Sequence, residues 1–303
     1  MEATRVLSAV TGCLARWSEN VGDRGVTHTL NPFIGCPIGW SQCGEACYAQ
    51  HFLVWRKRGH TRDEWGRTVY VKKNAPSLYI KEVQTRSGKN AIGIFASSVT
   101  EPLPPQPEAR AITRELLEAM VEFPPGRGLI IQTHTSYAAS PEIVEVLVEL
   151  SKRTSVLVSI SVETNRDNIR GLGKPCCSID KRLNAFEVLS SHNIATQASI
   201  SPIMPCDPEE FAQTLRLCGA WRVILDHWEI GDGSKGSRTE STGVPQRLKD
   251  NGYNAKWFSA EVLDELEPIF RAHGFPGGVG RKKDYFAFIP EHSVLRHHFG
   301  WLK

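Results

Sequence analysis

The sequence predicts an α/β fold in which six parallel strands form a partial, TIM-like (β/α)6 barrel. Six short β-rich runs alternate with amphipathic helical stretches along the 303 residues. Several of these runs are almost continuously apolar or β-branched, as expected for parallel strands that are covered on both faces. A succession of β-then-α units favours a parallel sheet. In such folds, functional residues gather where the strands end and in the loops that follow.

The elements can be placed in chain order. The predicted strands are Val26–Phe33, Ala91–Ser97, Leu129–His134, Val156–Val162, Ala195–Ile203 and Trp221–Trp228. The predicted helices are Glu108–Phe123, Pro141–Lys152, Asp180–Ser191 and Asp207–Cys218. Two stretches have irregular composition. Residues 57–90 are basic and polar, and Gly231–Asn254 is rich in small and charged residues, so we expect a mobile loop over the site there.

These assignments suggest three parts. Residues 1–24 are an expected N-terminal extension, residues 25–230 form the barrel, and residues 231–303 are a loop and a helical or strand extension that closes it. No apolar run is long enough for a membrane span, and the first residues lack a signal-peptide core, which predicts a cytoplasmic protein. The net charge of +3 is modest, whereas a dedicated duplex-binding protein is usually more basic.

Three of the eight cysteines, Cys36, Cys43 and Cys47, lie within twelve residues. In a chain without a secretion signal, such clustering indicates metal or redox chemistry more often than disulfides. Three thiolates can hold three irons of a four-iron cluster and leave the fourth iron open to a cofactor or substrate. Two alternatives remain at this point: structural zinc with His51 as a fourth ligand, and three unrelated buried thiols.

The segment Asn31-Pro32-Phe33-Ile34-Gly35-Cys36, together with Cys47-Tyr48-Ala49, resembles the opening of radical S-adenosylmethionine (SAM) proteins related to spore photoproduct lyase. The resemblance covers roughly residues 25–230. It implies a partial barrel of the radical SAM type, a [4Fe-4S] cluster held by Cys36, Cys43 and Cys47, SAM as cofactor, and an external electron donor such as ferredoxin or flavodoxin. One feature departs from the family, which usually shows CxxxCxxC. Here six residues separate the first two cysteines and three separate the last two.

Polar residues at the strand ends are the candidate cofactor contacts. The end of the second strand resembles the loop that binds the methionine amino group of SAM in the family, and hydroxyls with a carboxylate suit an ammonium group. The end of the fourth strand corresponds to the ribose-binding strand, where a carboxylate can accept hydrogen bonds from both ribose hydroxyls. The candidate cofactor-binding residues are Tyr48, Ser97, Ser98, Thr100, Glu101, His134, Ser161, Glu163 and Lys174.

The substrate is less well marked than the cofactor. In photoproduct lyases a separate cysteine returns a hydrogen atom to the product radical. Cys176 and Cys177 are candidates for such a catalytic role, as is Tyr48, although neither cysteine aligns with the family's donor and both can be incidental thiols. The modest charge and this missing alignment favour a small-molecule substrate over DNA. The alternatives are a lyase-like DNA repair enzyme, a non-catalytic zinc or iron–sulfur protein that interacts with nucleic acid, and a barrel enzyme with a degenerate metal loop.

Overall fold

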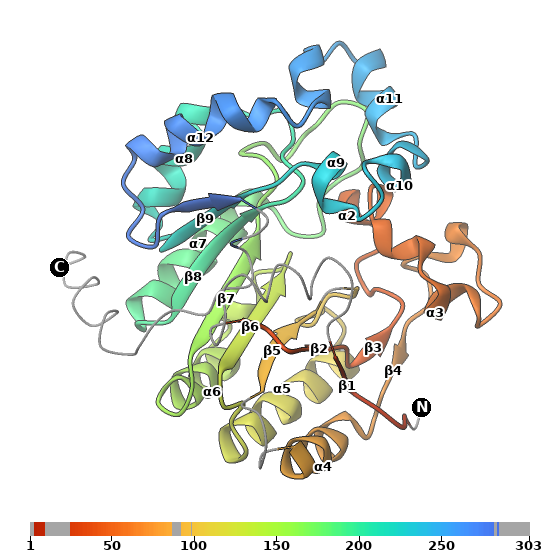
Figure 1. Ribbon diagram of the computed structural model, residues 1–303, viewed down its shortest axis with the longest axis vertical. Coiled ribbons are helices and arrows are strands. Elements are labelled where there is room, and N and C mark those ends of the chain that lie inside the picture. Colours follow the sequence, from red (N-terminus) through yellow and green to blue (C-terminus); the bar gives the residue numbers. More distant parts are fainter. Residues whose placement is uncertain (1–2, 10–24, 87–91, 98, 282–283, 285–303) are drawn as a thin grey trace.

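The computed structural model describes residues 3–9, 25–86, 92–97, 99–281 and 284. Its main feature is an eight-stranded sheet with the strand order β1-β2-β5-β6-β7-β8-β9-β10 (Figure 1). The strands from β2 to β10 are mutually parallel, and β1 pairs antiparallel with β2. The strands of the sheet are β1 Leu7–Ala9, β2 His28–Leu30, β5 Gly93–Ala96, β6 Gly128–Thr133, β7 Val156–Ser161, β8 Ala195–Ile200, β9 Arg222–Leu225 and β10 Val279–Arg281. A second, two-stranded sheet consists of β3 Phe33–Ile34 and β4 Tyr70–Val71.

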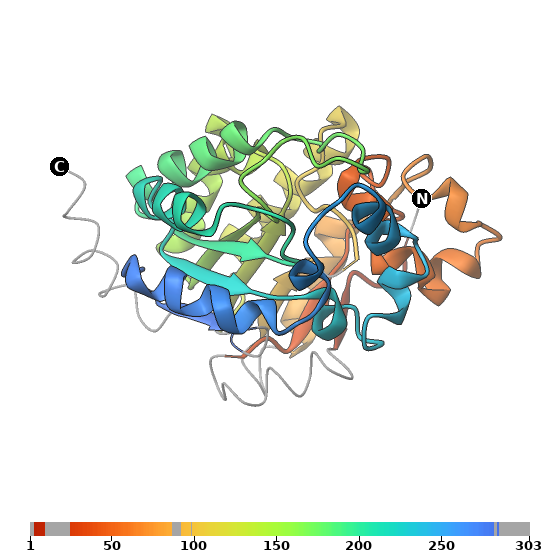
Figure 2. The same ribbon diagram turned by 90° about the horizontal axis from the view of Figure 1, so that it is seen from above.

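Helices connect the strands and lie along one side of the curved sheet (Figure 2). The longer ones are α4 Ala75–Arg86, α5 Pro107–Glu122, α6 Pro141–Ser151, α7 Ile179–Ser191, α8 Pro208–Leu217 and α12 Val262–Ala272. The short ones are α2 Gln42–Glu45, α3 Leu53–Arg56, α9 Trp228–Gly231, α10 Ser237–Glu240 and α11 Val244–Asp250. The six strands and four helices expected from the sequence are all present, and the predicted parallel α/β architecture is confirmed.

Three expectations were wrong in detail. The sheet contains two strands more than predicted, because β1 and β10 extend its two edges. Residues 57–90 are not wholly irregular, since they include β4 and all of α4. The segment Gly231–Asn254 is not simply a loop but contains α10 and α11, and the strand predicted to reach Trp228 ends at Leu225, so that α9 begins at Trp228.

The two faces of the central strands differ in chemistry. Side chains such as Val158, Ile160 and Val223 belong to the main hydrophobic core, which they share with helix residues such as Leu147 and Phe186. Side chains alternate across a strand, so the residues between them point to the opposite face. That face is polar: the buried polar side chains on it include Ser159, Ser161, Gln197, Ser199 and Arg222.

Hydrogen bonds join these polar side chains across neighbouring strands. Gln132 Nε2 donates to Ser161 Oγ at 3.2 Å, and Gln197 Nε2 donates to Ser159 Oγ at 3.0 Å. Arg222 Nε in turn donates to Gln197 Oε1 at 2.7 Å. Buried polar groups are costly unless they are hydrogen-bonded, and this ladder offsets that cost while keeping the inner face of the sheet polar.

None of the helices in the described part of the chain is long and apolar enough to cross a membrane.

Candidate active site

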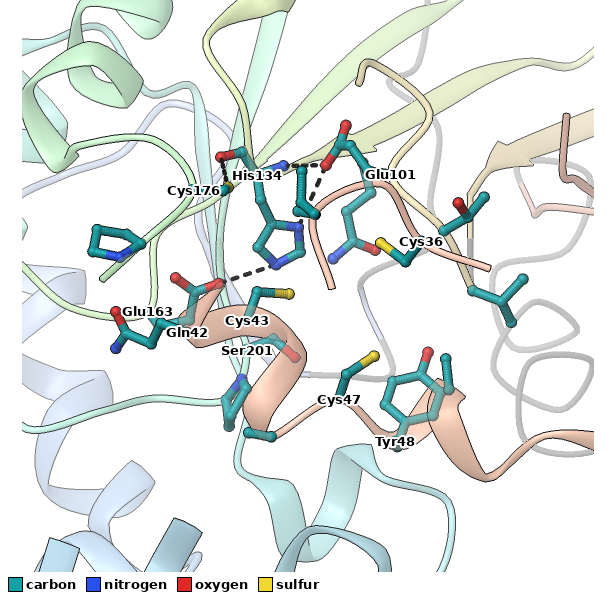
Figure 3. Close-up of a pocket in the computed structure, with 18 of the residues that line it drawn as sticks. Cys36, Gln42, Cys43, Cys47, Tyr48, Glu101, His134, Glu163, Cys176 and Ser201 are labelled. Carbon is teal, nitrogen blue, oxygen red and sulfur yellow. Dashed lines mark hydrogen bonds and ion pairs between the residues drawn. The ribbon is translucent and has the colours of Figure 1, made fainter. Parts of the chain in front are cut away.

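The three clustered cysteines line one pocket at the carboxyl ends of the parallel strands (Figure 3). Cys36 follows β3, Cys43 lies in α2, and Cys47 comes just before a short 3-10 helix, Tyr48–His51. The loop between the first two cysteines is held by tight turns, in which Gly39 N donates to Cys36 O at 3.1 Å and Ser41 Oγ donates to Ile38 O at 2.7 Å. We call residues 36–47 the cysteine loop.

The strand ends predicted from the sequence converge on the same pocket. The pocket spans about 1070 Å³ of space, a volume that includes open solvent at its mouth. Several strands contribute to its lining because the carboxyl ends of parallel strands meet at one edge of a sheet. The polar and sulfur-bearing residues that line it are Cys36, Gln42, Cys43, Cys47, Tyr48, Ser97, Thr100, Glu101, Gln132, His134, Glu163, Cys176, Arg182, Ser201 and Met204.

His134 lies between two carboxylates. Its Nε2 is 3.2 Å from Glu163 Oε1, and its Nδ1 is 3.7 Å from Glu101 Oε2. Burial by itself would lower the pKa of His134, but the charge of the nearby Cys43 thiolate and the two carboxylates outweigh it and raise the pKa well above 6.5. These interactions favour the charged form of the imidazole, which lies beside the cysteine loop.

Glu163 makes a second ion pair, with Arg182 on α7. Arg182 Nη1 donates to Glu163 Oε2 at 3.0 Å and to Ser161 O at 2.7 Å. Burial opposes ionisation of Glu163, but the hydrogen bond from His134 and the charge of Arg182 lower its pKa from 4.5 to about 2. Glu163 is thus a carboxylate held between two cations at the pocket wall.

Glu101 is almost fully buried, and hydrogen bonds use both of its oxygens. Oε1 accepts from Leu103 N at 2.9 Å and from Thr133 Oγ1 at 2.6 Å, while Oε2 accepts from His134 N at 2.8 Å. These bonds tie the loop after β5 to the end of β6. Thr100 adds a contact just before the cysteine loop, because its Oγ1 donates to Gly35 O at 2.8 Å.

Burial and neighbouring charge act on the thiols of Cys36 and Cys47. Burial, followed by the charges of the other two thiolates, raises the pKa of Cys36 well above its usual range. Burial and the charge of Cys43 raise the pKa of Cys47 to about 12. Buried thiols such as Cys36 and Cys47 lose protons readily only when a metal group compensates their charge. The donor set therefore fits an iron–sulfur cluster bound through three sulfurs.

The zinc alternative finds less support in this geometry. Within the described residues there is no group of three or more His, Cys, Asp or Glu side chains close enough to hold a single metal ion. His51, the expected fourth zinc ligand, does not line the pocket. Its pKa is lowered by burial and then by the charges of Arg62 and Arg238, so its neighbours are cations rather than thiolates.

Not every candidate from the sequence reaches the pocket. Ser98 lies outside the described residues. Lys174 is exposed and does not line the pocket, although its carbonyl accepts a hydrogen bond from Gln42 N. Ser161 is fully buried behind the pocket wall, and Cys177 also lies off the lining.

Cys176, in contrast, lies at the pocket wall, where its Sγ is 3.4 Å from the carbonyl oxygen of His134. Burial raises the pKa of this thiol to about 12. Arg182 was missed in the sequence because it stands in the charged run Asp180-Lys181-Arg182 at a helix start, which is typical of a solvated surface. Burial of Arg182 could have been inferred only from its spacing. It shares one helix face with Ile179 and Phe186.

Comparison with known proteins bears on the fold. No family of known sequences matches this chain, and no curated protein does. Among solved structures, the chain is similar to a double mutant of spore photoproduct lyase with bound AdoMet (that is, SAM) and a dinucleoside spore photoproduct. The TM-score is 0.55 at 14% sequence identity, over 89% of this chain and 85% of that one. The two chains share the arrangement of strands and helices.

Proposed function

We propose that this chain is a radical SAM enzyme. The observation that carries the proposal is the convergence of Cys36, Cys43 and Cys47 on one pocket with the charged residues at the ends of parallel strands. The fold shared with a SAM-bound spore photoproduct lyase supports the same assignment. When bound, a [4Fe-4S] cluster supplies the electron that cleaves SAM, and the resulting 5′-deoxyadenosyl radical abstracts a hydrogen atom from the substrate.

Different residues of the pocket bind the cluster and the separate parts of SAM. Cys36, Cys43 and Cys47 hold the cluster by three thiolates. Ser97 and Thr100, which line the pocket at the end of β5, have hydroxyls that suit the ammonium group of SAM. Glu163, kept ionised by its two cations, is the acceptor for the ribose hydroxyls.

Two further residues of the wall have supporting roles. Arg182 is the only arginine or lysine among the described residues that line the pocket, and it is suited to the SAM carboxylate. Glu101 is also acidic, but both of its carboxylate oxygens already accept hydrogen bonds from the protein. Its role is to orient His134 and the loop after β5.

The substrate is a small molecule in this proposal. The support is the modest net charge of the chain and the absence of an aligned donor cysteine. If a hydrogen atom returns to the product from the protein, Cys176 is the donor, since its thiol lies at the pocket wall whereas Cys177 lies off it. Repair of a photoproduct is the second candidate, favoured by the ligands of the similar structure, and the substrate assay should include a dinucleoside photoproduct.

Anaerobic reconstitution tests the assignment. Chain incubated with iron and sulfide should bind about four irons per chain, and with dithionite it should convert SAM to 5′-deoxyadenosine. Changing any one of Cys36, Cys43 and Cys47 to alanine should abolish both the iron binding and the cleavage.

The matched control is Cys218→Ala, since Cys218 is also a buried thiol but lies in the main hydrophobic core at the end of α8. This variant should keep its cluster. A wild-type chain that binds one zinc ion tightly and stays colourless under these conditions would rule out the proposed function.

A further inference from the structure

A strongly basic surface lies beside the cysteine loop. The segment 53–73 contains seven lysines or arginines against two acidic residues, a local surplus of five, whereas the whole chain carries only +3. We call the exposed cations of residues 53–67 the basic platform; they are Arg56, Lys57, Arg58, Arg62 and Arg67. Within the part of the chain that the structure describes, Arg56, Lys57 and Arg67 form no ion pair. Their charge is therefore available to a partner.

The platform is fixed rigidly to the cysteine loop. Trp55 and Trp65 are buried and pack with Cys36 in one hydrophobic cluster, which Cys43 and Cys47 also contact. The two indole rings meet edge to face, with centroids 5.4 Å apart. Gly66 presses against the loop so closely that an added Cβ would lie 2.2 Å from the backbone of Gly39. The surface cations thus stand one layer of aromatic side chains away from the cysteines.

Exposed apolar side chains accompany this charge. Leu53 and Val54, at the start of α3, are 64% and 50% exposed, and Trp40, within the cysteine loop, is 58% exposed. These are three of the five large apolar side chains that stand out as exposed in the described residues. Apolar residues rimmed by charge are typical of protein interfaces.

The platform and the pocket lie on different sides of the cysteine loop. The pocket wall on one side comes from the ends of β5, β6 and β7. On the other side the α3–β4 segment projects outward, away from the helices that cover the sheet (Figure 1). A partner seated on the platform would approach the cysteines from behind and leave the pocket free.

We propose that the basic platform docks a small acidic redox protein, which delivers an electron to the cluster. The inference rests on the proposed function. In the step, the donor loses one electron and the cluster gains it. Complementary charge steers such encounters, and weak redox complexes need little buried surface.

Nucleic acid is the other polyanion that a basic surface attracts, but two features disfavour it. Single strands bind where aromatic rings are exposed for stacking. A strand needs several such rings for successive bases. Here Trp55 and Trp65 are buried against the cysteine loop, which leaves Trp40 as the one exposed tryptophan among the described residues. A base that reacts must also enter the pocket, and the platform lies on the opposite side of the loop.

The test uses two reductants, reduced flavodoxin as the acidic protein and dithionite as the small molecule. Each is given to the reconstituted wild-type chain and to the variant Arg56→Glu/Lys57→Glu/Arg67→Glu. With flavodoxin at low salt, formation of 5′-deoxyadenosine should fall about ten-fold or more in the variant. With dithionite the rate should stay unchanged. Added salt should slow the wild type toward the variant.

Lys81→Glu/Lys152→Glu/Lys181→Glu is the matched control, since it reverses three exposed cations, one on α4, one just after α6 and one on α7, and should behave as wild type. The milder variant Arg56→Gln/Lys57→Gln/Arg67→Gln should lie between the wild type and the reversed variant.

Equal flavodoxin rates in all variants would overturn the docking proposal. So would a platform variant that binds a DNA duplex more weakly while its flavodoxin rate is unchanged. If the wild type fails with dithionite as well, the proposed function fails instead. Docking is then still tested by the affinity of flavodoxin for the wild type and the two platform variants, measured by calorimetry.

Discussion

Glu163 shows what a residue pattern can and cannot predict. The alternation of Ser159, Ser161 and Glu163 indicated that a carboxylate ends the fourth predicted strand and faces inward, and Glu163 does line the pocket. Its partners could not be predicted, because Arg182 reaches it from a helix that begins sixteen residues later. The state of a side chain depends on contacts between distant segments, and a local pattern does not contain them.

The paired cations predict a large cost for neutralising this carboxylate. Glu163→Gln leaves His134 and Arg182 without their shared counter-charge in a buried site, so the free energy of unfolding should fall by roughly 3–5 kcal/mol. Urea unfolding at pH 7 measures it. Glu118→Gln, which breaks an exposed ion pair with Arg114, should cost less than about 1 kcal/mol. Similar losses in the two variants would contradict the buried ion-pair arrangement.

The lowered pKa of Glu163 also predicts a pH dependence. The folded chain holds this pKa at about 2, against 4.5 for an unperturbed glutamate, so the unfolded state binds the proton more readily. The stabilisation is complete above pH 4.5 and is lost as the pH falls from 4.5 toward 2. Urea unfolding at a series of pH values should show this loss in the wild type and a flatter dependence in Glu163→Gln. Parallel curves would show that Glu163 ionises normally.

At the scale of elements, the sequence predicted those with a strong period and missed those with a weak or interrupted one. Helix α4 buries a narrow stripe, Ala75, Tyr79 and Val83, after a basic run that reads as a loop. Helix α12 has a pronounced apolar face but contains Pro268, which normally argues against a helix interior. Strands β1 and β10 have only three residues each, too few to show an alternation.

The contact between the cysteine loop and the following segment yields a test with a matched pair of glycines. Gly59 and Gly66 both have positive φ, 82° and 85°, so alanine at either costs roughly 1–2 kcal/mol of backbone strain. At Gly59 an added Cβ meets nothing within 4 Å, whereas at Gly66 it lies 2.2 Å from Gly39 and Trp40 backbone atoms. The free energy of unfolding of Gly66→Ala should therefore be lower than that of the wild type by roughly 2–5 kcal/mol in total.

Urea unfolding followed by tryptophan fluorescence measures both variants. Gly66→Ala should also bind less iron on reconstitution, since the displaced backbone belongs to the cysteine loop, while Gly59→Ala should bind as much as wild type. If the two variants lose equal stability, the close packing of Gly66 on the loop is wrong.

At the scale of the whole molecule, the cysteine loop joins parts of the chain that are far apart in sequence. Glu45, between Cys43 and Cys47, accepts a hydrogen bond from Gly173 N at 2.6 Å and pairs with Arg247 on α11. No local pattern indicates these contacts, which span 128 and 202 residues. They connect the loop after β7 and the segment after β9 to the cysteine loop.

This connection predicts that a substitution in the cysteine loop changes how firmly α11, in the C-terminal third of the chain, is held. Glu45→Gln keeps the size of the side chain but removes the charge that faces Arg247, so α11 should detach from the loop more often. Trypsin cleavage after Arg247 and Lys249 should then become several-fold faster, because cleavage follows the population of the open form. Glu240→Gln, in neighbouring α10, is the control and should be cleaved as the wild type is.

Since the pair between Glu45 and Arg247 is partly exposed, added salt should speed cleavage of the wild type and leave Glu45→Gln nearly unchanged. Equal cleavage of Glu45→Gln and wild type would mean that α11 is held by its apolar contacts alone, through Val244 and Leu248.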